Sequence, residues 1–232
     1  MKLSPEAAPS RDVSPSCTHC LTRHRCVFQS VPGAADKLQV REFSVRPDSV
    51  LEVQGEHQDT LGVIKVGQAK GSRTVTAGKH KAIIFLGRGR VVGLGSAFRH
   101  RSPLTLTSLT PMRVCAARAE LLHNEALSDE RFLAAVVDAA GRFVNCVTDW
   151  SGLLREDDFG RRLHRALQMI ATEEGSCSFR IPSHAQLADL LGSRRETVSR
   201  YLGTLVEQGQ LRKLDRWHGV LADCAGRSAT AG

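Results

Sequence analysis

Three cysteines lie close together near the start of the 232-residue chain. Cys17, Cys20 and Cys26 have the spacing C-x2-C-x5-C, so one short loop can present three thiolates to a metal ion or cluster. Thiolates are soft ligands, which select zinc or iron–sulfur clusters over hard cations. An iron–sulfur cubane commonly takes four cysteine ligands, one more than this loop offers. The spacing therefore predicts a metal site that a further residue completes.

Other chemistries fit the same residues. His19 or His24 could complete a zinc site, because C-x2-C is a common zinc-binding spacing. The thiols could also stay free of metal and switch through a disulfide. A thiol oxidoreductase is disfavoured, because its Cys-x-x-Cys motif normally opens a helix after a strand, whereas this one follows a proline- and serine-rich segment. Three further cysteines have no partner at ligand spacing and are expected to be small buried or incidental residues: Cys146, Cys177 and Cys224.

The composition is that of an ordinary globular protein, with 41% hydrophobic and 24% charged residues. No stretch approaches the ~20 apolar residues of a membrane-spanning helix, and the N-terminal region lacks the apolar run of a secretory signal. We therefore expect a cytoplasmic protein without membrane contact, in which structural disulfides are rare. The net charge of +8 comes mostly from residues 31–122, so it does not locate a nucleic-acid surface. No catalytic set of side chains stands out, and we expect no enzyme activity.

The chain pattern predicts an α+β protein of four segments. Residues 1–30 form a flexible segment that carries the cysteine cluster, because their first half is rich in proline and serine. Residues 31–122 contain short apolar or alternating runs such as LGVIKV and KAIIFL, broken by glycine and proline, which indicates an antiparallel barrel or jelly roll. Residues 123–154 are expected to be one long helix, and residues 155–226 a second domain.

The predicted long helix carries a continuous apolar stripe. Apolar residues recur every three or four positions between Asp129 and Leu154. Because this helix separates two apparent domains, we expect it to pair with its twin in a homodimer rather than pack inside the chain. The interface residues predicted in this way are Phe132, Val136, Phe143, Val147 and Trp150.

The segment HAQLADLLGSRRETVSRYLGTLVEQGQL has the layout of a helix-turn-helix, and an alternating stretch after it predicts a two-stranded wing. Four polar residues lie away from the apolar side of the second helix, near the end that enters a major groove: Arg195, Glu196, Ser199 and Arg200. Arginine can donate two hydrogen bonds to guanine, and glutamate can accept one from cytosine. Ser193 and Glu196 also fit a capping box, in which Glu196 would only close the helix end.

The residues ETVSR, one turn after LADLLG and ahead of a glycine and a wing, resemble the recognition helix of the CRP/FNR family of bacterial transcription regulators, and within it the FNR-type branch. The resemblance spans roughly residues 17–223. It implies a cyclic-nucleotide-binding-like β jelly roll as sensor domain, a dimerisation helix and a winged helix-turn-helix. It also implies a homodimer that binds an inverted TTGAT-type repeat in double-stranded DNA. Arg200 would then read the guanine, Glu196 the opposing cytosine region and Ser199 a thymine.

Two positions depart from the pattern of this family. Arg194 stands where the family usually has Ser or Thr, which affects how the recognition helix is capped. The stretch TAGKHK, residues 76–81, resembles the family's polymerase-contacting surface but is basic here. RNA polymerase is an expected partner, and the basic stretch leaves open whether the contact is made in the usual way.

The same resemblance bears on the cysteines. FNR-type regulators share the N-terminal spacing and take a fourth ligand from a cysteine late in the barrel, where PMRVCAARAELL places Cys115. The resemblance therefore implies one 4Fe-4S cluster on Cys17, Cys20, Cys26 and Cys115, and a regulator that senses oxygen through it. FNR-type helices carry an acidic residue where this chain has Val147, so we expect a weaker monomer tendency without the cluster.

Cyclic-nucleotide sensing is the other activity that the family suggests. It uses a Gly-Glu pair for the ribose and an Arg-Ser or Arg-Thr pair for the phosphate. Here Gly93 is followed by Leu94, and Arg101 and Ser102 come at a shorter distance. The missing carboxylate disfavours nucleotide binding. A different small-molecule effector in the barrel stays open as an alternative trigger.

Overall fold

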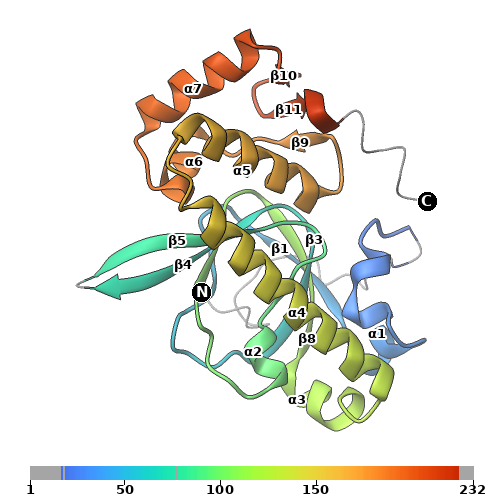
Figure 1. The fold of residues 1–232 in the computed structure, drawn as a ribbon. Helices are drawn as coiled ribbons and strands as arrows, with labels where there is room; N and C mark the ends of the chain where they lie inside the picture. The colour runs from blue at the N-terminus through green and yellow to red at the C-terminus, as the bar shows by residue number, and fades with distance from the viewer. Residues whose placement is uncertain (1–16, 18, 77, 225–232) are drawn as a thin grey trace.

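The computed structural model describes residues 17, 19–76 and 78–224. The part of the predicted flexible segment before Cys17 lies outside these residues. Figure 1 shows a β-barrel with the long helix α4 lying along it, and a second, mainly helical domain that rests on one end of the barrel. This arrangement confirms the predicted α+β fold class.

The barrel consists of two four-stranded antiparallel sheets. The first has the strand order β1-β8-β3-β6, formed by Arg41–Val45, Met112–Arg118, Thr60–Val66 and Val91–Val92. The second has the order β2-β7-β4-β5, formed by Val50–Glu52, Thr105–Ser108, Ala69–Thr76 and Lys79–Leu86. Several strands have a bulge, which bends them as barrel closure requires. The hairpin of β4 and β5 projects from the barrel (Figure 1).

Short helical segments surround the barrel. Before β1 the chain forms the 3-10 turns η1 (Arg23–Arg25) and η2 (Val27–Gln29) and the helix α1 (Ala34–Lys37). After β6 comes α2 (Leu94–Ala97), and after β8 come α3 (Ala119–Leu121) and the π-helical turn η3 (Leu122–Ala126). Val27 and Phe28 are buried against the barrel, so the segment that follows Cys26 is fixed by the core.

Helix α4 runs from Glu130 to Leu153. The Asp129 carboxylate accepts hydrogen bonds from the backbone N–H of Arg131 at 2.9 Å and of Phe132 at 3.3 Å, which satisfies two of the amides that a helix start leaves unpaired. Its buried face packs on the chain's own barrel and on η2, so α4 connects the cysteine segment with the second domain.

The structure corrects the predicted dimer interface on α4. Phe132, Val136 and Trp150 are at most 1% exposed and lie inside the protomer. The other two residues of the prediction, Phe143 and Val147, are half-buried against the same core. The exposed apolar side chains of α4 lie on another face: Leu133, Val137 and Val144, of which the last two are 54% and 60% exposed. Helical periodicity reveals an apolar stripe but does not say which neighbour covers it.

The second domain contains a helix-turn-helix and a small sheet. It begins with α5 (Phe159–Glu174), continues through β9 (Ser178–Arg180), α6 (His184–Leu191) and α7 (Arg195–Glu207), and ends with β10 (Leu211–Lys213), β11 (His218–Leu221) and the turn η4 (Ala222–Cys224). The wing is three-stranded, because the central strand β11 pairs with β10 on one side and with β9 on the other. Cys177, expected to be an incidental thiol, is disulfide-bonded.

The two domains share one hydrophobic core. Apolar residues of the barrel, of the end of α4 and of the helix-turn-helix form a single buried cluster. Polar contacts add to it: the Gln186 side chain donates to the Leu109 carbonyl at 2.8 Å, and the Gln68 side chain donates to the Arg180 carbonyl at 2.8 Å. Lys70 and Asp189 form an ion pair. No helix among the described residues is long and apolar enough to cross a bilayer.

Candidate functional site

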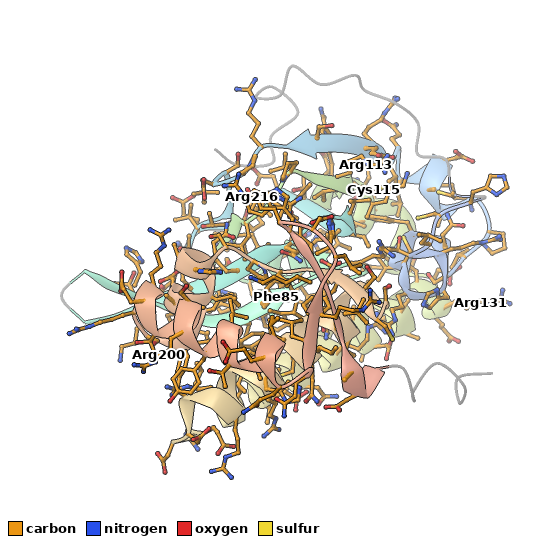
Figure 2. The ribbon with its side chains drawn as sticks, turned by 90° about the horizontal axis from the view of Figure 1, so that it is seen from above. Phe85, Arg113, Cys115, Arg131, Arg200 and Arg216 are labelled. Atoms are coloured by element: carbon orange, nitrogen blue, oxygen red, sulfur yellow. The ribbon has the colours of Figure 1, made fainter. Side chains whose placement is uncertain are left out.

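The structure brings the four predicted cysteine ligands to one small cavity. Cys17, Cys20 and Cys26 come from the loop around η1, and Cys115 comes from β8, far along the chain. Cys115 occupies a central position of its sheet, with Glu42 of β1 on one side and Val63 of β3 on the other. Seen in Figure 2, Cys115 lies on the barrel, apart from Arg200 in the second domain.

Charge and apolar walls surround these sulfurs. Phe28, Val40 and Val63 line the cavity, and the Lys65 ammonium group lies beside the thiols. Lys65 also forms an ion pair of 2.6 Å with Glu42. The Cys20 sulfur is 3.0 Å from the Thr22 hydroxyl oxygen. A cationic side chain next to four thiols favours their ionised form. Its positive charge also offsets part of the negative charge that four thiolates bring to a metal site.

Burial dominates the acidity of these thiols. It raises the pKa of Cys26 to about 11 and the pKa of Cys115 to about 12, and it raises the pKa of Cys17 together with the repulsion from Cys20. Thiols with such pKa values are protonated and unreactive at neutral pH unless a metal replaces the proton. A thiol oxidoreductase needs the opposite, a lowered thiol pKa. This environment therefore suits thiols that act as metal ligands better than thiols that act as nucleophiles.

The donor set fits an iron–sulfur cluster in type and number, with four thiols and no other ligand type in the cavity lining. The same sulfurs do not form a single-ion site: no group of three or more His, Cys, Asp or Glu side chains among the described residues has the arrangement to hold one metal ion. The cavity measures about 20 Å³, which is room for about one water molecule and too little for an eight-atom cubane. A cluster would therefore require the loop to move outward from the barrel. Leu21 in this loop is 72% exposed, whereas the neighbouring Thr22 is buried.

The recognition helix presents all four predicted DNA-reading residues to solvent. Arg195, Glu196, Ser199 and Arg200 are exposed on α7. The opposite side of α7 is held by three residues buried in the core: Val198, Leu202 and Leu205. Figure 2 shows Arg200 on the outer side of the second domain. This surface can dock into a major groove without rearranging the domain.

The capping alternative for Glu196 is not realised. Arg194 is the N-cap of α7, has extended backbone angles and makes no side-chain cap hydrogen bond. The capping box of this region is one helix earlier, where Ser183 and Gln186 close the start of α6. Gly192 ends α6 with a φ of +61°, a conformation that glycine adopts without strain. Glu196 is therefore not engaged in closing a helix end.

The wing adds basic residues that sequence reasoning missed. Arg212, Lys213 and Arg216 are exposed around the turn between β10 and β11. The Arg216 guanidinium stacks on the Trp217 ring at 4.8 Å, and Arg180 approaches the same ring at 5.3 Å. Such residues contact phosphates and so add affinity without reading sequence. Their density in the LRKLDRW stretch was the signal available in the sequence.

Another residue that sequence reasoning missed is Glu52, in the barrel. It is nearly fully buried and accepts a hydrogen bond from the Gly93 N–H at 2.6 Å and from the Ser102 hydroxyl at 2.7 Å. Burial raises its pKa above the usual range, and these two hydrogen bonds oppose that effect. The Arg101 guanidinium donates to the Gly55 carbonyl at 2.8 Å. The internal carboxylate of Glu52 thus engages two of the donors that an anionic ligand could use, the Gly93 N–H and the Ser102 hydroxyl.

A cavity of about 360 Å³ adjoins Glu52, between the barrel and α4. Most of its lining is apolar, including Leu94, Phe98, Phe143 and Val144. Its volume is that of a small-molecule site. Glu52 engages the Gly93 N–H and the Ser102 hydroxyl, and most of the lining is apolar, so the cavity suits an uncharged molecule better than a nucleotide.

An exposed recognition helix on a helix-turn-helix, joined by a long helix to a barrel, defines a DNA-binding regulator with a sensor domain. Comparison with known families agrees. The sequence matches the cyclic nucleotide-binding domain over residues 42–129 and the Crp-like helix-turn-helix domain over residues 161–226. The chain is therefore a DNA-binding transcription regulator of the CRP/FNR family.

Individual relatives support this assignment. The chain is 25% identical over 228 residues to a probable transcriptional activator of Rhizobium leguminosarum bv. viciae, covering 90% of each chain. It is 27% identical over 195 residues to the probable transcriptional regulator flp of Lacticaseibacillus casei, covering 83% of this chain and 88% of the relative. The structure of FixK2 from Bradyrhizobium japonicum matches with a TM-score of 0.69 and 21% identity, over 83% of this chain and 98% of FixK2.

Proposed function

We propose that the chain is an oxygen-responsive regulator that holds a 4Fe-4S cluster on Cys17, Cys20, Cys26 and Cys115. The observation that carries this proposal is the placement of Cys115, which lines the same cavity as the three loop thiols. No feature of the local sequence requires a strand residue to face that loop. When bound, the cluster supplies a group that oxygen can oxidise or dismantle.

The residues of the chain suggest how the cluster state reaches the dimer. Cys26 is followed directly by Val27 and Phe28, which are buried in the same cluster as Phe132 and Val136 of α4. Ligation fixes Cys26 relative to β8, and release of the loop loosens the packing beneath α4. A separate, exposed face of α4 carries Leu133, Val137 and Val144, which we assign to the partner helix in a homodimer.

Dimerisation then sets the DNA geometry. Two copies of α7 related by a two-fold axis can enter successive major grooves about one helical turn apart, as an inverted repeat requires. We assign Arg200 to the guanine of a TTGAT-type half-site, Glu196 to the cytosine region and Ser199 to a thymine. Arg195 and the wing arginines lie where phosphates pass. RNA polymerase is a proposed further partner, with the projecting hairpin of β4 and β5 as its contact.

The direct test is the absorption spectrum of the full-length protein purified without oxygen, together with iron, sulfide and zinc analysis. We expect a brown protein with about four iron and four sulfide per chain, whose visible absorption bleaches in air. A colourless protein that holds one zinc per chain contradicts the proposal. The DNA-reading assignment would stand in that case, because it rests on α7 alone.

A regulator switched by a small molecule in the barrel is the second candidate, and the 360 Å³ cavity favours it. Its predominantly apolar lining and the engaged Glu52 point to an uncharged apolar ligand. Thermal melting separates the candidates. Cyclic AMP should leave the Tm unchanged, whereas an apolar effector that controls DNA binding should raise the Tm of air-exposed, cluster-free protein and restore its DNA affinity.

A further inference from the structure

A cleft of about 450 Å³ lies between the cysteine loop and the side of α4. It adjoins the cysteine cavity, with which it shares Cys26 and Gln29, and shares no lining residue with the barrel cavity. Basic side chains dominate its lining: Arg23, His24 and Arg25 come from η1, and Arg142 comes from α4. Gln29 and Ser30 add neutral hydrogen-bonding groups. None of the activities considered above uses this cleft.

The positive charge of the cleft is only partly compensated. Arg142 forms an ion pair with Asp138, which is the one acidic residue of the lining. No acidic side chain among the described residues pairs with Arg23 or Arg25. The excess is two positive charges even when His24 is neutral.

A further guanidinium group stands behind the cleft. Arg90 donates to the Arg142 carbonyl at 2.7 Å and is held by an ion pair with Glu173. Burial lowers the pKa of Arg142, and the charges of Arg90 and Arg25 lower it further. The Arg25 side chain is exposed and runs along Gly89, where an added Cβ would meet it at 3.3 Å. Guanidinium groups held close together repel one another, and an anion between them relieves that repulsion.

The cleft stays open when two copies pair through α4. Residues of an α-helix follow one another at about 100° around the axis, so Ala135, Asp138 and Arg142 lie roughly opposite the exposed apolar face formed by Leu133, Val137 and Val144. A partner helix on that face leaves the cleft in contact with solvent. A ligand could therefore bind the dimer as well as the monomer.

We propose that this cleft binds a small phosphate-bearing anion, held between the arginines of η1 and Arg142. The guanidinium fork matches the oxygens of phosphate in pairs, and the volume admits a ligand larger than a single phosphate group. One wall belongs to the cysteine loop and the other to α4, so the bound anion ties these elements together. The proposal applies to the loop position of this structure, in which Cys26 forms part of the cleft wall.

Calorimetric titration of the full-length protein with inorganic pyrophosphate, at ionic strength held constant with chloride, tests this site. We expect a Kd below about 1 mM and about tenfold weaker binding by Arg142→Gln. The matched control is Arg155→Gln, which removes the same charge from an exposed position beyond the end of α4 and should bind as the original protein does. Equal losses in the two variants, or no binding above chloride, overturn the proposal.

Two further measurements exclude other binding modes. Arg200→Ala should keep its pyrophosphate affinity, and a loss there would assign the anion to the DNA-reading surface and defeat the proposal. Citrate should bind more weakly than pyrophosphate, and tighter citrate binding would overturn the assignment to phosphate. Pyrophosphate should also slow amide hydrogen exchange in residues 19–30 and 135–142. Unchanged exchange there at saturating pyrophosphate contradicts the placement of the ligand.

Discussion

The recognition helix and the cysteine loop are positioned in opposite ways. Helix α7 has its buried residues and its DNA-reading residues on one short stretch, and the reading side chains point to solvent. The cysteine loop turns its thiols inward, and its fourth thiol comes from a strand far along the chain. A local surface is set by helical periodicity, whereas a shared cavity depends on the whole barrel. Substitutions should therefore have local effects on α7 and long-range effects at the cavity.

The largest expected effect is the loss of the cluster in Cys115→Ser. A cluster with three of its four thiolates is poorly held, so we expect anaerobically purified Cys115→Ser to keep less than about a tenth of the iron of the original protein. The matched control is Cys146→Ser. Cys146 is equally buried but lies on α4, with its thiol directed at the Phe85 carbonyl at 3.5 Å. Equal iron loss in both variants would show that folding rather than ligation was affected.

Helix α4 lies between the two regions, and its two apolar faces should respond differently. Phe132→Ala should lower the free energy of unfolding by roughly 3–5 kcal/mol, because it opens a cavity under the cysteine segment. Chemical denaturation at one fixed protein concentration measures this loss.

Val137→Asp should instead weaken the homodimer at least about tenfold and leave the fold intact, because the side chain is exposed in the protomer. Sedimentation equilibrium measures the dimer and circular dichroism the fold. A fully dimeric Val137→Asp protein would mean that another surface makes the dimer.

Arg200→Ala should cost roughly 1–3 kcal/mol of binding to an inverted TTGAT-type repeat and leave the iron content unchanged. Its control is Arg161→Ala on α5, another exposed arginine, which lies outside the recognition helix. Fluorescence anisotropy with specific and scrambled DNA provides the measurement. If both DNA sequences lose the same affinity, Arg200 contacts phosphate and not guanine.

The smallest expected effect concerns Glu52. Its pKa in the folded protein is raised above the ordinary value of 4.5, so the folded state holds this proton more tightly than the unfolded state. Stability from this group is present below about pH 4.5 and is lost as the pH rises through the raised value. The difference in unfolding free energy between the original protein and Glu52→Gln should therefore change in favour of Glu52→Gln as the pH rises across that window. A pH-independent difference contradicts this explanation.

Sequence reasoning predicted what periodicity and local motifs control. The barrel, the long helix, the helix-turn-helix and the four exposed residues of α7 follow from spacing and turn residues. The face of α4 that packs inside the chain could not be predicted, because Phe132 and Val137 are both apolar and only the barrel distinguishes them. Glu52 was missed for a similar reason. Its donors, Gly93 and Ser102, are separated from it in sequence and meet it only in the folded barrel.

The continuous core between the barrel and the helix-turn-helix has a consequence for how such regulators can be recombined. Leucines of α6 pack in the same cluster as Phe85 of β5, and Gln186 reaches the loop after β7. A chimera that joins this barrel to another DNA-binding domain would have to recreate these contacts between the barrel and α6. Matching the linker length alone would leave exposed apolar surface on both halves.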